Sequence, residues 1–188
     1  MKFQEKKAER IYKGFFEFIK LKVQFETYKG EFKESNVECF HRGDSSCILL
    51  NQSETKELLL VEQFRYPTTY YDSGWLIELV AGSIDKNETP EKSIKREIEE
   101  EIGYEVKEVC KIGHYYLSPG GTTERIFIFY AEVNQTDKTR SGGGKIGESE
   151  DIKLIKLKHS EVEIQIKENK IIDAKTIIAL QWFQKNKT

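Results

Sequence analysis

The sequence has little of what several protein classes depend on. It contains three cysteines, which form no C-x-x-C pair, and three scattered histidines. A disulfide framework and a zinc site are therefore disfavoured, and a metal ion would need oxygen ligands. The longest apolar runs, such as residues 58–61, are far too short to span a bilayer, and the charged first residues lead into no apolar signal region. We expect a soluble, cytoplasmic protein with no membrane contact.

Neither sign of charge is in excess. The chain carries 30 lysines and arginines against 32 aspartates and glutamates, a formal net charge of −2. A surface devoted to nucleic acid needs a basic excess to displace counterions, so nucleic-acid binding is not expected. With 188 residues, 38% of them hydrophobic, the chain is long enough for one domain of ordinary size and a small appendage.

Strand patterns occupy most of the chain. Aromatic and β-branched residues alternate roughly over 15–25 and 32–40, and a turn at 28–31 between them predicts a hairpin or small antiparallel sheet. Further strands are expected at 46–50, 58–64, 75–80, 109–116, 126–133 and 152–157. Short helical segments are expected at 160–168 and at 174–184, the second capped by Asp173.

One longer helix is predicted in the middle of the chain. Thr89 is a suitable N-cap, Pro90 suits the first helical position, and Gly103 suits the C-terminal end. Isoleucine recurs between them at i, i+4 and i+8, as Ile94, Ile98 and Ile102, which predicts a narrow buried stripe. Strands on both sides of a central helix, with a helix at the end, indicate an α/β sandwich with a mixed sheet.

The predicted helix carries an acidic face. Glu97, Glu100 and Glu101 stand at i, i+3 and i+4, so their carboxylates share one side of the helix. Like charges at this spacing cost a few tenths of a kcal/mol each, roughly, and a divalent cation such as Mg²⁺ would offset that cost. Taken alone, the run is more typical of a solvated acidic surface than of a metal site.

The surroundings of this acidic run form a longer motif. The fixed residues of the motif are Gly82, Glu88, Arg96, Glu97, Glu100, Glu101 and Gly103. Their spacing resembles the Nudix box, G-x5-E-x7-R-E-U-x-E-E-x-G-U, where U is an aliphatic residue. Every fixed position matches, and only the last U differs, being Tyr104. That difference concerns packing and leaves the metal ligands in place.

The resemblance to Nudix hydrolases implies roles for these residues. In the family the motif forms a loop, a helix and a loop that bind Mg²⁺ or Mn²⁺. The implied metal ligands are Glu97, Glu101 and the carbonyl oxygen of Ala81, with Glu100 as a further member of the catalytic centre. Arg96 is implied to pair with Glu88 and hold the loop, while Gly82 and Gly103 shape the backbone. The implied reaction is hydrolysis of a diphosphate by a metal-activated water.

Residues outside the motif indicate the type of substrate. The segment 118–125, Ser-Pro-Gly-Gly-Thr-Thr-Glu-Arg, is similar to a segment of ADP-ribose pyrophosphatases and the related GDP-mannose hydrolases, although alone it is typical of a turn. Segments 12–16, 61–65, 173–176 and 178–182 also resemble the bacterial ADP-ribose enzymes. The resemblance implies that Arg65 binds the diphosphate and Glu124 the terminal ribose, with Arg42 and Ser118 as further substrate contacts. The alternative for Arg65 is an ordinary surface arginine at the end of a strand. The alternative for Glu124 is an ion pair with Arg125.

The resemblance also implies a division of the chain. Residues 1–44 match a small antiparallel sheet domain that in relatives is exchanged across a homodimer, and residues 45–188 match the Nudix hydrolase domain. Substrate sites in such dimers are built from both subunits. We therefore expect a homodimer, with the N-terminal sheet as the dimerising part.

A glycine-rich segment lies between the expected strands at 126–133 and 152–157. Neither the strand nor the helix of a dinucleotide-binding site flanks its three consecutive glycines, 142–144, so such a site is not expected. The glycines instead suggest a flexible lid. In the ADP-ribose enzymes a glutamate in this loop is the general base, which points to Glu148, with Glu150 as a metal ligand. A solvated acidic loop is the alternative.

The sequence thus predicts a Mg²⁺-dependent Nudix hydrolase that cleaves ADP-ribose to AMP and ribose 5-phosphate. The first alternative is the same chemistry on GDP-mannose or another nucleoside diphosphate sugar. The second is a Nudix module that binds such a ligand without hydrolysing it. Such modules usually lose glutamates of the motif, and this chain retains them all.

Overall fold

The chain folds into two compact units in the computed structural model, which describes residues 1–144 and 151–187. One unit comprises residues 1–44 together with 116–125, and the other comprises 45–115 together with 126–188. Segment 116–125, which the sequence analysis placed in the second domain, thus belongs with the N-terminal sheet. Phe40 is its anchor, because its N–H donates to the Gly121 carbonyl at 2.8 Å and its carbonyl accepts from the Thr123 N–H at 3.2 Å.

The first unit is a three-stranded antiparallel sheet. Its strands β1 (Phe3–Lys13), β2 (Glu17–Glu26) and β3 (Phe32–His41) pair in chain order. Gly30, with a φ of 80°, makes the predicted turn between β2 and β3, where its N–H donates to the Thr27 carbonyl. The sequence analysis did not predict β1, because its neighbouring charges break the alternation and all of its residues are exposed.

The second unit is built on a mixed sheet, as predicted. The strand order is β10 (Lys153–Lys158), β5 (Glu57–Phe64), β4 (Ser45–Gln52), β9 (Arg125–Val133) and β8 (Cys110–Tyr116). Strands β4 and β9 are parallel, whereas β4–β5 and β5–β10 are antiparallel. Every residue of β4 is buried, so this strand lies at the centre of the unit.

The segment 75–83 forms two strands where the sequence predicted a single one. Strand β6 (Trp75–Glu78) pairs with β5, and β7 (Val80–Ser83) pairs with β4. The chain changes partner at Leu79, whose N–H donates to the Thr176 hydroxyl at 2.9 Å. This change of partner brings Ala81 opposite Cys47 and Gly82 opposite Ser46, beside the central strand.

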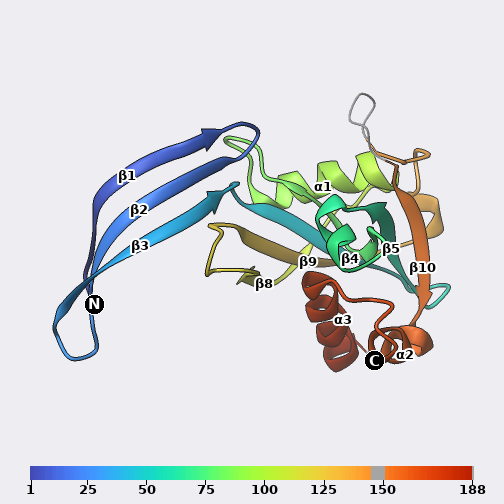
Figure 1. Ribbon diagram of the computed structural model, residues 1–188. Coiled ribbons are helices and arrows are strands. Elements are labelled where there is room, and N and C mark those ends of the chain that lie inside the picture. Colours follow the sequence, from blue (N-terminus) through green and yellow to red (C-terminus); the bar gives the residue numbers. More distant parts are fainter. Residues whose placement is uncertain (145–150, 188) are drawn as a thin grey trace. The chain divides into compact units, whose positions relative to one another are not determined.

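Helices cover both faces of the sheet (Figure 1). Helix α1 (Pro90–Glu101) lies on one face, and α3 (Ala174–Lys187) lies on the other, preceded by the short α2 (Val162–Lys167). Three-residue or five-residue 3₁₀ segments occur at Tyr66–Tyr70, Gln135–Asp137 and His159–Glu161. The alternation of β4 divides the core, because Ile48 and Leu50 pack with α1 while Cys47 and Leu49 pack with α3.

The predicted ends and stripe of α1 are confirmed. The Thr89 side chain accepts a hydrogen bond from the Lys92 N–H, and Pro90 occupies the first turn. Gly103 follows the helix with a φ of 75°. The three isoleucines of the stripe are almost fully buried in the core beside β4 and β5.

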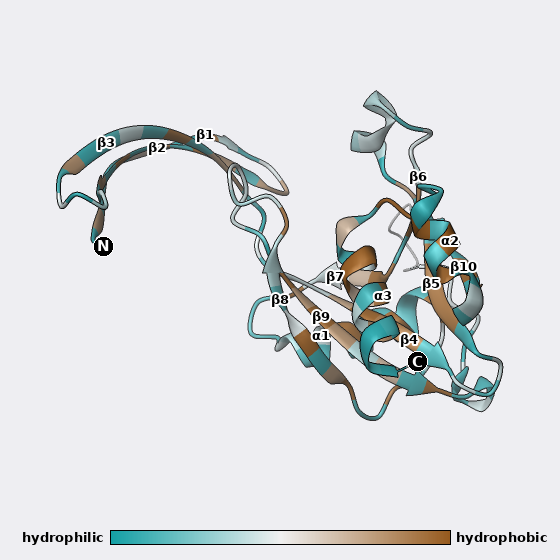
Figure 2. Cartoon of the chain, turned by 90° about the horizontal axis from the view of Figure 1, so that it is seen from below, coloured by the Kyte–Doolittle hydropathy of each residue, from teal (hydrophilic) through white to brown (hydrophobic). Residues whose placement is uncertain are grey.

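The two units differ in how their apolar residues are distributed (Figure 2). In the second unit they gather in strands such as β5 and in α3, where they form the core. Along β1–β3, short apolar and hydrophilic segments alternate, and large side chains such as Phe3 and Phe32 stay exposed. Among the described residues, the structure has no helix long and apolar enough to cross a membrane.

Candidate active site

Arg96 is the hub of the charged groups on α1. Its Nε and Nη2 donate to the two carboxylate oxygens of Glu88 at 3.2 and 3.1 Å, so the expected partner is in place. Its Nη1 donates to Glu97 at 2.7 Å and to Glu100 at 3.1 Å. Nη2 also reaches the Ser83 carbonyl at 3.3 Å. One guanidinium therefore ties the loop before α1 and the end of β7 to the acidic face of the helix.

These contacts keep the charges of the hub fixed. The hydrogen bond from Arg96 lowers the pKa of Glu88, with a smaller contribution from the Asp85 N–H, and together they outweigh the effect of burial. The bond to Glu88 in turn raises the pKa of Arg96, aided by Glu97. Both groups are therefore ionised at neutral pH, and the ion pair persists as the pH falls until Glu88 is protonated below its ordinary pKa.

The carboxylate of Glu97 lies directly against Gly82. A Cβ atom on Gly82 would overlap the Glu97 carboxyl group, so only glycine allows β7 and this side chain to come so close. Glu101, one turn further along the helix, is 4% exposed. The tight spacing brings the carboxylate of Glu97 to the backbone of the Ala81–Gly82 segment.

The donor set of this region fits a hard divalent cation. Glu97, Glu100 and Glu101 offer only carboxylate oxygens, and the nearby backbone of β7 offers carbonyl oxygens, which are the ligands that Mg²⁺ and Mn²⁺ prefer. Among residues 1–144 and 151–187, no three such side chains already surround a common point. Arg96 instead holds Glu97 and Glu100, so a cation would share these two carboxylates with the guanidinium or take them from it.

The first glycines of the expected lid are bound to the end of α1. The N–H groups of Gly143 and Gly144 donate to the carbonyls of Glu101 and Glu100 at 2.7 and 3.2 Å. These carbonyls would otherwise lack partners at the helix end. The described part of the glycine run is thus an anchored C-terminal cap. Glu148 and Glu150, the expected base and its neighbouring ligand, lie outside the described residues.

Arg65 directly follows β5 and is joined to a buried ion pair. Its Nε donates to Glu78 Oε1 at 2.7 Å, and Lys175 Nζ donates to the other oxygen of the same carboxylate. Glu78 is 2% exposed and Lys175 is 8% exposed. Burial disfavours the charged lysine, but Glu78 and the nearby Asp173 outweigh it and raise the pKa of Lys175. The lysine is therefore charged at neutral pH.

Sequence reasoning did not assign roles to Glu78 and Lys175. A single acid within the apolar segment Leu-Ile-Glu-Leu-Val, residues 76–80, was the available signal. A buried acid normally requires a cationic partner. Lys175, 97 positions away, could not be recognised as that partner from the order of residues alone.

The first unit brings two of the other expected substrate residues together. Arg42 and Glu124 are ion-paired at 3.5 Å, and the Arg42 guanidinium lies 5.0 Å from the centre of the Phe16 ring. Arg125 pairs with Asp44 (Nε to Oδ1, 3.1 Å), and this arrangement differs from the alternative in which it would bind Glu124. The Ser118 carbonyl accepts from the N–H groups of 121 and 122, which forms the turn of the Pro-Gly segment.

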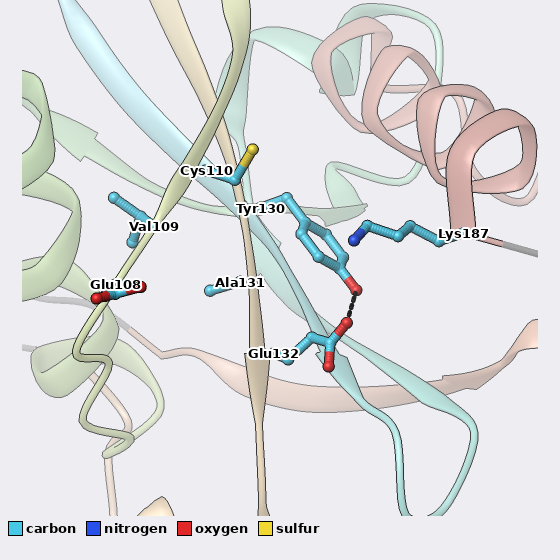
Figure 3. A pocket seen from close by; sticks show the side chains of 7 residues that line it. All are labelled: Glu108, Val109, Cys110, Tyr130, Ala131, Glu132 and Lys187. Carbon is cyan, nitrogen blue, oxygen red and sulfur yellow. Dashed lines mark hydrogen bonds between the residues drawn. The ribbon is translucent and has the colours of Figure 1, made fainter.

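A surface hollow lies elsewhere in the second unit (Figure 3). It has a volume of about 270 Å³, and Glu108–Cys110, Tyr130–Glu132 and Lys187 line it. Tyr130 donates to Glu132 at 3.1 Å, and burial is the main cause that raises the pKa of Tyr130 to about 12. None of the expected site residues lines this hollow, so it contributes nothing to the acidic site.

Comparison with known proteins identifies the family of the chain. Residues 41–180 match the NUDIX domain. The chain is 41% identical over 157 residues to GDP-mannose pyrophosphatases of Escherichia coli O1:K1 and of Shigella flexneri, covering 82% of this chain and 81% of each relative. Among solved structures, an ADP compounds hydrolase superposes with a TM-score of 0.75 at 15% identity, over 100% of this chain and 97% of the other.

The chain therefore belongs to the Nudix family and has the fold of a Nudix hydrolase. The expected mixed sheet with a small antiparallel N-terminal sheet is confirmed. The roles assigned to individual residues remain proposals.

Gly82→Ala should impair the proposed metal site while the protein still folds. The added methyl group collides with the end of a side chain that can turn away, so we expect little loss of stability but displacement of the Glu97 carboxylate. The variant should lose the rise in Tm on adding Mg²⁺ and most of its hydrolytic rate. Gly113→Ala is the matched control, because the methyl group there meets only the end of the Tyr115 side chain. Normal Mg²⁺ stabilisation of Gly82→Ala would contradict the metal assignment.

Proposed function

We propose that the protein hydrolyses the diphosphate of a nucleoside diphosphate sugar. The observation that carries this proposal is the acidic face of α1, held by Arg96 and packed against β7 at Gly82. This arrangement keeps carboxylates close together in spite of their repulsion. Such an arrangement suits a reaction in which phosphate charge must be neutralised by a cation.

GDP-mannose is the first candidate substrate. Relatives with 41% identity over 82% of the chain are named GDP-mannose pyrophosphatases, which supports this choice. ADP-ribose, the first expectation from the sequence, becomes the second candidate. It is supported by the resemblance of segment 178–182 to the ADP-ribose enzymes, whereas the ADP compounds hydrolase is too distant in sequence to bear on the substrate.

Our proposal includes a divalent cation, with Mg²⁺ as the first choice and Mn²⁺ as a substitute. Glu97, Glu101 and the Ala81 carbonyl are its proposed ligands, with Glu100 and Glu150 as additional ones. When bound, the cation would neutralise phosphate oxygens and lower the pKa of the attacking water. Arg96 would keep the carboxylates in position, and Glu148 would accept the proton of the water.

Arginine and glutamate side chains are proposed to hold the substrate. The side chain of Arg65 is 42% exposed and binds Glu78 through Nε, and in the described part of the chain no other side-chain partner of Arg65 is found. Its terminal amino groups suit a diphosphate, which accepts paired hydrogen bonds. Glu124, Arg42 and Ser118 are proposed to contact the sugar side of the substrate.

The first experiment is an assay of GDP-mannose and ADP-ribose side by side, with Mg²⁺ and with a chelator. We expect release of nucleoside monophosphate and sugar phosphate that requires Mg²⁺ and favours GDP-mannose. Glu97→Gln and Glu101→Gln should reduce the rate to background while circular dichroism stays unchanged. Binding of either compound without turnover would overturn the enzymatic proposal and support a ligand-sensing module. A preference for ADP-ribose would revise only the substrate.

Glu148→Gln tests the proposed base. Loss of the proton acceptor should lower kcat on the order of 10²-fold or more, while KM changes little, because a general base acts in the transition state. Steady-state kinetics on the preferred substrate provide the measurement, and Asp151→Asn, a nearby acid without an assigned role, is the matched control. If the substitution raises KM at unchanged kcat, the base is a different residue.

We also propose that the protein is a cytoplasmic homodimer. The cysteines at 39, 47 and 110 form no disulfide in the structure, which is in keeping with a reducing compartment. In the first unit, Phe3 and Phe25 are directly opposite each other on β1 and β2, so they share one face of the sheet. They are 77% and 40% exposed, and a second chain would remove this apolar surface from water.

Sedimentation velocity measures the oligomeric state. We expect the wild-type protein to sediment with the mass of two 22.0 kDa chains. Phe25→Glu places a charge on the exposed face of the sheet and should shift the equilibrium toward the monomer. Ile164→Glu, an equivalent change at an exposed position of α2, should leave the dimer intact. A wild-type monomer at micromolar concentration would refute the dimer.

A further inference from the structure

A buried carboxylate is shared between two cations from distant parts of the chain. Glu78, the last residue of β6, receives Arg65 on Oε1 at 2.7 Å and Lys175 on Oε2. The two bonds use the two oxygens of the Glu78 carboxylate, so together the cations limit its rotation. Arg65 is partly exposed while the other two side chains are buried. The solvent-facing end of this chain of charges is therefore the arginine.

The inner end of the chain of charges is fixed by the first turn of α3. Lys175 Nζ also donates to Asp173 Oδ1 at 3.0 Å. The other oxygen of Asp173 accepts from the N–H and the hydroxyl of Thr176 at 3.0 and 2.6 Å, which is the predicted cap of α3. Because the Thr176 hydroxyl also accepts a hydrogen bond from the Leu79 N–H, the helix binds the β6–β7 junction at two neighbouring residues, Glu78 and Leu79.

The lysine changes what the arginine can do. With Lys175 present, the negative charge of Glu78 is shared, and Arg65 is held in one orientation without its charge being fully cancelled. Without the lysine, a buried carboxylate would have Arg65 as its only cation among these residues, and the arginine would be drawn inward. A guanidinium that binds a diphosphate must keep both its orientation and its charge.

We infer that Lys175 and Glu78 are positioning residues that orient the Arg65 guanidinium toward the diphosphate of the substrate. The inference rests on the proposed function, since it takes the diphosphate as the ligand of Arg65. Lys175 itself is enclosed by Glu78 and Asp173, so it acts through Arg65. An ion pair with a purely structural role would leave the action of Arg65 unaffected.

A double-mutant cycle tests the coupling. The variants are Lys175→Met, which keeps the length of the side chain and removes its charge, Arg65→Ala, and the two combined. We expect Lys175→Met to lower kcat/KM roughly tenfold or more, mainly through KM, as for the loss of a charged hydrogen bond. In the Arg65→Ala background the same change should cost less than about twofold. Losses that multiply would overturn the inference.

A second variant covers the case in which Lys175→Met does not fold. Glu78→Gln keeps the shape of the side chain and breaks the link between the two cations, and it should show the same non-additivity with Arg65→Ala. Lys156→Met is the matched control, because Lys156 pairs with Glu57 on the strands β10 and β5 away from this network. Its kinetics should equal those of the wild type.

Failure of the inference and failure of the proposed function give different results. Each variant is also titrated with GDP-mannose and ADP-ribose by calorimetry, so the cycle can be completed from affinities if the wild type hydrolyses neither. Unchanged KM and affinity in Arg65→Ala would remove Arg65 from the proposed site and overturn the inference with it. Impaired Arg65→Ala with additive losses would overturn the positioning role alone.

Discussion

The site depends on how closely α1 approaches β7. At Gly82 the absence of a side chain lets the Glu97 carboxylate lie on the strand backbone, and the three isoleucines on the buried face of the helix maintain this approach. Burial of each isoleucine contributes roughly 1.5–3 kcal/mol, far more than the few tenths that neighbouring carboxylates cost the helix. The apolar face of α1 thus supplies the stability that its acidic face lacks.

Arg96 offsets the repulsion among the carboxylates of that acidic face. Its guanidinium has five N–H donors in a fixed plane, and it distributes them among Glu88, Glu97, Glu100 and a backbone carbonyl. A lysine could not hold the loop and the helix at once, because its single ammonium lacks the planar fork. The same arrangement would set a bound metal ion in competition with Arg96, because the ion would share Glu97 and Glu100 with the guanidinium or take them from it.

The sequence predicted best those features that are determined by neighbouring residues. The cap at Thr89, the glycine after α1 and the isoleucine stripe depend on residues within a few turns, and all are present. The division of 75–83 into two strands depends on β4, β5 and Thr176, which are remote in sequence. The Glu78–Lys175 pair is remote in the same way. The strand at 3–13 has an exposed, charged pattern that gives no periodic signal.

The terminal helix α3 covers one face of the sheet and also holds the junction between β6 and β7. Its first turn fixes Glu78 through Lys175 and Leu79 through Thr176, and only Val80 separates these two residues from the Ala81–Gly82 segment. Through Glu78 this turn is connected to Arg65, and through Leu79 it is connected to β7, the strand against which Glu97 lies. A diphosphate that binds a cation and an arginine together needs both at a constant separation. The first turn of α3, which holds Glu78 and Leu79, would provide this constraint within the second unit if the proposed site is correct.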